Sequence, residues 1–171
     1  MFTSSLAPAF MALLVAGAPS APERAAHELA GLPRCAAPTA TTPPDWKRTP
    51  LREGFSIAMP ACFELAAEQP RFIHGGQEWR CEVPAGTVST VTASWGMWTQ
   101  RSFGPNEERC AAEIGGLPAL VMISVNETRI WYLTGTMHEP VVSLWSKTAD
   151  EVKRLQPVAW SGRGPSTASP K

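Results

Sequence analysis

Aspartate and histidine are scarce in this chain of 171 residues, which has only two aspartates, Asp45 and Asp150, and three histidines. The scarcity disfavours Ca²⁺ loops, aspartate-based phosphoryl transfer and Ser-His-Asp hydrolysis, because each of these needs such residues at fixed places. The motifs G-x-S-x-G, P-loop, H-E-x-x-H and C-x-x-C are also absent. The sequence therefore predicts a protein that is not an enzyme and that has no cofactor and no metal.

Charge is also sparse, and it is balanced. Charged residues make up 18% of the chain, with 15 basic and 15 acidic side chains. The arginines are scattered and form no basic run. Without a long-range field of one sign, neither a nucleic acid nor an anionic membrane is an expected partner.

No charged side chain occurs in residues 1–20. An apolar core at 10–18 is too short to span a bilayer, and small residues follow it. This layout is typical of a secretory signal peptide, so we expect a periplasmic or secreted protein with no stable membrane span. The alternative is an apolar N-terminal tail.

Four cysteines, Cys35, Cys62, Cys81 and Cys110, support export. An even number in an exported chain indicates two disulfides, for which three pairings are possible. We expect Cys81–Cys110, because both residues adjoin strand-like runs, and Cys35–Cys62, which would join the entry segment to the domain. The alternative is four buried thiols in a cytoplasmic protein.

Composition divides the remainder into three parts. Residues 21–50 are rich in Pro and Ala and predict an extended linker with a short helix at 23–30. Residues 51–161 form the expected single domain, and 162–171 form a loose tail.

Within the domain, alternating apolar and polar residues predict strands at 55–59, 78–83, 88–95, 117–125, 129–137 and 141–145. Thr148 to Glu151 is a capping box, so a helix should begin there and end before Pro157. A short closing strand is expected at 158–160. The predicted fold class is α+β, with an antiparallel sheet of six or seven strands and a C-terminal helix.

Seven tryptophans are many for a chain of this length. Period-two counting places Trp95 on the same strand face as Val91, which predicts a core position. Trp98 falls on the polar face of Thr92 if the strand continues, whereas a bulge at Gly96 would return it to the core.

The tryptophans also suggest a ligand site. Trp98, with Trp79 and Phe103, would stack on a sugar or a peptide, and Arg101 would lie in the loop at its rim. The alternative is that these rings only fill a core. A further alternative is a hydrolase that uses His74 or His138 with a nearby glutamate, although no ligand spacing supports it.

The segment 54–60 (GFSIAMP) and the segment 115–119 (GGLPA), followed by a hairpin, a strand, a capped helix and 158–161, resemble the PsbP/DcrB-like superfamily. The resemblance covers 54–161 and implies a sandwich around an antiparallel sheet, without enzymatic activity and with an accessory role. The four cysteines and the poor helix at 62–69 depart from that pattern, and no functional residue carries over. We therefore expect an exported, non-catalytic domain that binds a protein partner or acts as an envelope accessory protein, with a small-ligand module as the alternative.

Overall fold

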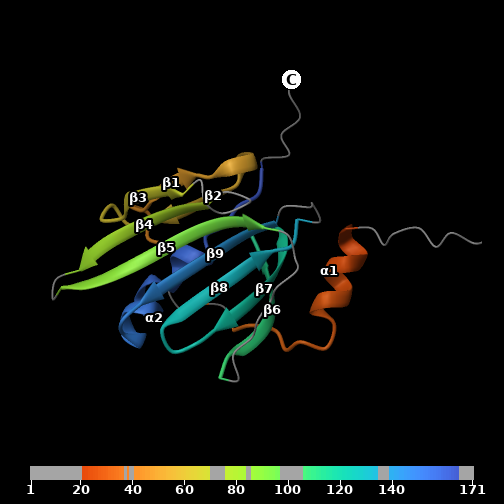
Figure 1. Cartoon of the computed structure of the whole chain (residues 1–171). Coiled ribbons are helices and arrows are strands. Elements are labelled where there is room, and N and C mark those ends of the chain that lie inside the picture. The colour runs from red at the N-terminus through yellow and green to blue at the C-terminus, as the bar shows by residue number, and fades with distance from the viewer. Residues whose placement is uncertain are drawn as a thin grey trace, which may run out of the picture.

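An antiparallel sheet dominates the computed structural model of the chain, which describes residues 21–36, 38, 41–69, 76–83, 86–96, 106–134 and 139–165. Within these residues, seven strands form one sheet in the order β3-β4-β5-β9-β8-β7-β6 (Figure 1). Their bounds are β3 Glu64–Gln69, β4 Gly76–Val83, β5 Thr87–Gly96, β6 Glu108–Ile114, β7 Leu117–Ile123, β8 Glu127–Tyr132 and β9 Glu139–Ser146. The predicted α+β class and strand number are confirmed.

Tight turns join β6, β7 and β8, which are consecutive neighbours in the sheet. Gly115 and Gly116 connect β6 to β7 with φ of 59° and 81°, a left-handed conformation that favours glycine in two-residue hairpins. A second short turn connects β7 to β8. The last strand, β9, then inserts between β5 and β8, so residues distant in sequence become neighbours at the centre of the sheet.

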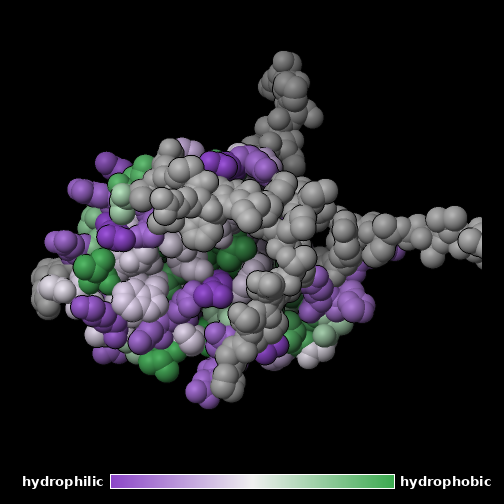
Figure 2. Space-filling model, in the orientation of Figure 1, coloured by the Kyte–Doolittle hydropathy of each residue, from purple (hydrophilic) through white to green (hydrophobic). Residues whose placement is uncertain are grey.

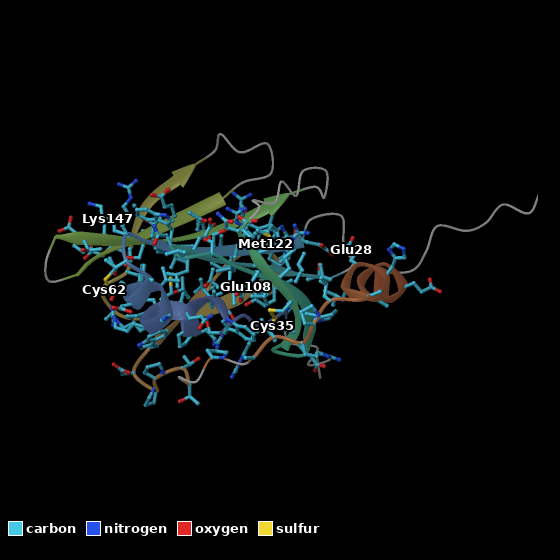
Figure 3. The ribbon with its side chains drawn as sticks, turned by 90° about the horizontal axis from the view of Figure 1, so that it is seen from below. Glu28, Cys35, Cys62, Glu108, Met122 and Lys147 are labelled. Carbon is cyan, nitrogen blue, oxygen red and sulfur yellow. A yellow bond between two sulfur atoms is a disulfide. The ribbon has the colours of Figure 1, made fainter. Side chains whose placement is uncertain are left out.

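A second layer covers one face of the sheet, which we call the inner face. It consists of α2 (Ala149–Ala159) and a two-stranded sheet of β1 (Lys47–Pro50) and β2 (Ser56–Met59). Figure 3 shows α2 on one side of the strands. The core between the layers contains fully buried side chains from both, among them Ile57, Val91, Ile130, Tyr132, Leu144, Leu155 and Val158.

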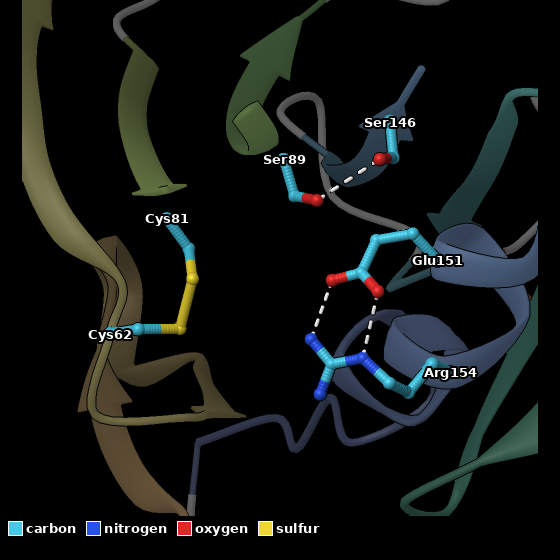
Figure 4. The surroundings of a disulfide bond; sticks show 6 residues. All are labelled: Cys62, Cys81, Ser89, Ser146, Glu151 and Arg154. Carbon is cyan, nitrogen blue, oxygen red and sulfur yellow. Dashed lines mark hydrogen bonds and ion pairs between the residues drawn. A yellow bond between two sulfur atoms is a disulfide. The ribbon is translucent and has the colours of Figure 1, made fainter. Parts of the chain in front are cut away.

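The helix α2 begins as predicted and ends later than predicted. Thr148 is its N-cap and accepts from the backbone N–H of Glu151, whose carboxylate also forms an ion pair with Arg154 (Figure 4). The expected end before Pro157 and the closing strand at 158–160 are wrong, because the helix continues to Ala159. An interior proline costs about 3 kcal/mol. Burial of apolar side chains around it against the sheet, at roughly 1.5–3 kcal/mol each, outweighs that cost.

All four cysteines form disulfides, but the expected pairing is wrong. The bonds are Cys35–Cys110 and Cys62–Cys81. Cys81 lies in β4 and Cys110 in β6, so each disulfide lies near a different edge of the sheet. Figure 4 shows the Cys62–Cys81 bond in the same view as the buried Ser89–Ser146 hydrogen bond.

The segment 21–50 differs from the predicted linker, because it packs against the sheet. The expected helix is present as α1 (Ala21–Leu29), which contacts β7. Backbone hydrogen bonds then join Cys35 N–H to Ala111 O (2.9 Å) and Ala111 N–H to Pro33 O (2.8 Å). The start of the expected loose tail is also ordered, since Arg163 and Ser56 exchange backbone hydrogen bonds. Strands β1, β3 and β6 were not predicted.

Candidate functional site

The outer face of the sheet, on the side opposite α2, carries polar and aromatic side chains in cross-strand rows. Alternation along β8 sends Ile130 and Tyr132 into the core, which leaves Arg129 and Trp131 on the outer face. The register aligns one row across four strands, and that row consists of Glu78, Thr92, Ser143 and Arg129. The adjacent row consists of Arg80, Thr90, Trp145 and Glu127.

A groove of about 520 Å³ crosses this face. Side chains of β4, β5, β9 and β8 line it, and we call it the outer-face groove. Its volume lies in the range of small-ligand sites, roughly 300–1,000 Å³. Figure 2, which views the molecule from the side opposite α2, shows pale and purple side chains over the middle of the sheet rather than a continuous apolar surface.

Arg129 is held in place by three partners in the groove. Its Nε and Nη2 donate to Glu127 Oε1 at 2.9 and 2.7 Å, and Nε also lies 3.2 Å from Ser143 Oγ. The guanidinium carbon lies 5.6 Å from the centre of the Trp131 ring, within cation–π range. A side chain fixed in this way loses little further entropy when a ligand hydrogen-bonds to it.

The carboxylates that line the groove are neutralised by neighbouring arginines. Glu127 pairs with Arg129, and Glu78 pairs with Arg80 at 2.7 Å. In each pair the two residues are two positions apart on the same strand, so their side chains share the outer face. The two pairs together contribute no net charge, which favours a ligand that is itself uncharged.

Trp145 is the exposed aromatic ring of the groove. It retains 40% of its accessible surface, although it lies on the central strand β9. Thr90 of β5 and Glu127 of β8 stand directly opposite it, and Ser143 is the next residue of β9 on the same face. Trp145 is therefore an apolar plane bordered by groups that donate and accept hydrogen bonds.

The structure tests two of the tryptophans discussed from the sequence. Trp95 is buried on the inner face, with 3% exposure, so its core position is confirmed. Trp79 is also buried in the core, at 4%, so its predicted role as a ligand-stacking ring is wrong. The other predicted residues, Trp98, Arg101, Phe103, His74 and His138, lie outside the described residues.

Trp131, Trp145 and Arg129 were not predicted as site residues from the sequence. The sequence does indicate that the two tryptophans face away from the core, because Trp131 stands between Ile130 and Tyr132, and Trp145 follows Leu144. A tryptophan at a polar-face position is unusual in a strand that has one buried face. Strand order was the missing information, since it alone brings β8, β9 and β5 together.

The described residues contain neither a cluster of metal-ligating side chains nor a helix that could span a membrane. In that part of the chain, no group of three or more His, Cys, Asp or Glu side chains could hold a metal ion. Among the same residues, no helix has the length and apolar composition needed to cross a membrane. Burial raises the pKa of Tyr132, whose side chain faces the core rather than the groove.

Neither the protein-family models, nor the curated proteins, nor the solved structures give a match to this chain. The resemblance to the PsbP/DcrB-like superfamily therefore stays a prediction.

Proposed function

We propose that this protein is a non-catalytic binding protein that acts outside the cytoplasm and takes its ligand in the outer-face groove. One observation carries the proposal: Trp145 is exposed on a central strand, beside an arginine that three neighbours hold in place. Exposed rings and oriented polar groups gathered in a hollow are the usual composition of a ligand site.

The disulfides support the proposed location. Cys35–Cys110 and Cys62–Cys81 use every cysteine of the chain. Such bonds persist in the periplasm or outside the cell, whereas cytoplasmic reductants keep thiols reduced. The leader-like residues 1–20 agree with export, and their cleavage stays a prediction.

The groove supports a small or extended ligand better than a globular protein partner. It is concave, and its charges are already paired, so it offers neither a flat apolar patch nor a field of one sign. A protein partner in the envelope stays a prediction from the sequence.

The test is a ligand-observed NMR screen of uncharged oligosaccharides and uncharged peptides against the full chain. Binding compounds should lose affinity for Trp145→Ala and keep it for Lys153→Ala. Lys153 is a suitable control because it is exposed on α2, in the layer that covers the opposite face of the sheet. If no compound binds, or if Trp145→Ala binds as well as the wild type, the proposal is wrong.

A further inference from the structure

We infer that the outer-face groove binds a neutral saccharide, with Trp145 as the ring on which a sugar unit stacks. The inference rests on the proposed function and names the class of ligand for the same site. Four properties of the groove support it: its aromatic plane, the hydroxyl groups around that plane, its charge balance and its place on the sheet.

The surroundings of Trp145 match the two-sided chemistry of a sugar ring. A pyranose presents C–H groups on its faces and hydroxyls around its rim. An indole plane buries the C–H face without requiring hydrogen bonds. Around that plane lie Thr90 and Glu127 directly opposite, Ser143 on the same strand, and Thr92 and Arg129 one row further along. In an antiparallel sheet, the Cβ atoms of directly opposite residues lie roughly 5 Å apart, and diagonal neighbours lie roughly 7–8 Å apart. Side chains at these positions can therefore reach the hydroxyls of a sugar that stacks on Trp145.

The hydrogen-bonding groups of the groove also suit hydroxyls. Thr90, Thr92 and Ser143 each carry a hydroxyl that can donate and accept, as each sugar hydroxyl can. Arg129 supplies donors and Glu127 supplies acceptor oxygens, and their ion pair fixes both groups. A ligand that donates and accepts at every position can satisfy such a mixture, whereas an acceptor-only anion cannot.

The charge balance of the groove favours a neutral saccharide over a uronate or a phosphate-bearing ligand. Each carboxylate that lines the groove has a cationic partner: Glu127 pairs with Arg129, and Glu78 pairs with Arg80, which lies next to the lining. An anionic ligand group is bound most strongly by an arginine whose charge has no carboxylate partner within the protein. Arg129 already pairs with the Glu127 carboxylate through Nε and Nη2, so its charge is compensated before a ligand binds.

The place of the groove on the sheet disfavours a peptide that adds a strand. Such peptides bind the free backbone groups of an edge strand. The groove lies over β5, β9 and β8, each of which pairs with a strand on both sides. A ligand here meets side chains rather than unpaired backbone, so recognition depends on the stacking ring and the hydroxyl groups.

Isothermal titration calorimetry with the full chain tests the inference. The probes are neutral hexasaccharides of glucose, mannose, xylose, galactose and N-acetylglucosamine, with hexagalacturonate as the charged control and uncharged hexapeptides as the second control. At least one neutral hexasaccharide should bind. For that probe, Trp145→Ala should weaken affinity about tenfold or more, while Trp145→Phe, which keeps a stacking ring, should recover most of it.

Ser143→Ala should weaken the same probe less than Trp145→Ala does, since it removes one hydroxyl and leaves the ring. Lys153→Ala should have no effect, and circular dichroism should show that every variant is folded. If uncharged peptides bind through Trp145 and no saccharide does, the inference is wrong and the proposed function stands. Equal or tighter binding of hexagalacturonate would overturn the charge argument and with it the inference. If nothing binds, or if Trp145→Ala binds as tightly as the wild type, the inference and the proposed function are both wrong.

Discussion

Removing one disulfide at a time allows the contribution of the other to be measured. In Cys62→Ala/Cys81→Ala, only Cys35–Cys110 remains, and it closes a loop with a sequence separation of 75. In Cys35→Ala/Cys110→Ala, only Cys62–Cys81 remains, with a separation of 19. Loop-closure entropy predicts that the first bond raises the free energy of unfolding by about 4.5 kcal/mol and the second by about 3.2 kcal/mol.

The measurement is urea unfolding of each double variant in its oxidised and its reduced form. Comparing two redox forms of the same variant cancels the cavity that Cys81→Ala leaves in the core, where Cys81 is buried. The oxidised-minus-reduced difference should be larger for Cys62→Ala/Cys81→Ala, by about 1.2 kcal/mol. The reverse order would refute the reasoning, because it would show that native-state effects outweigh constraint of the unfolded chain.

Peptide mapping of the non-reduced wild-type protein checks the connectivity independently. Trypsin places the four cysteines in four separate peptides, which span residues 35–47, 53–71, 81–101 and 110–129. The disulfides predict that 35–47 is recovered linked to 110–129, and 53–71 linked to 81–101. Recovery of 35–47 linked to 53–71 would contradict the structure and favour the pairing expected from sequence.

Three further predictions concern α2 and the core, each measured by chemical unfolding. Tyr132→Phe should cost about 1–3 kcal/mol, because the buried hydroxyl donates to Ala159 O and that carbonyl would lose its partner. Gly162→Ala should cost about 1–3 kcal/mol, because its Cβ would overlap the Tyr132 ring. The Arg154 hydrogen bond holds the pKa of Glu151 below its ordinary value of 4.5, so the pair stabilises the folded state above that pH and loses this effect as pH falls through the folded-state pKa. Glu151→Gln should remove that dependence, which is worth less than about 0.5 kcal/mol because Arg154 is 54% exposed; an unchanged acid profile would contradict it.

Sequence patterns predicted those parts of the fold in which local backbone preference and burial agree. From Thr90 to Trp95 polar and apolar residues alternate, and the structure has β5 there, with Val91, Ala93 and Trp95 buried. The capping box at Thr148 marks the start of α2 for a similar reason, since it satisfies backbone donors within one turn.

The predictions failed where distant contacts override local preference. Pro157 ordinarily ends a helix, but burial against the sheet continues this one to Ala159. The segment 21–50 has the composition of a linker, yet the Cys35–Cys110 bond and the pairing of β1 with β2 hold it against the domain. Composition reports the preference of a segment alone and contains no information about the surface that the segment meets.

Local alternation was enough to decide which side chains of β5 face the core, because successive residues of a strand point to opposite sides whatever their neighbours are. It placed Trp95 in the core, and it holds the same information for Trp145 on the outer face. Only the tertiary structure decided that β9 inserts between β5 and β8, which brings Trp145 beside Thr90 and Glu127. That order, like the pairing of the cysteines, depends on the packing of the whole core, where many distant contacts contribute together and no short stretch of sequence specifies the result.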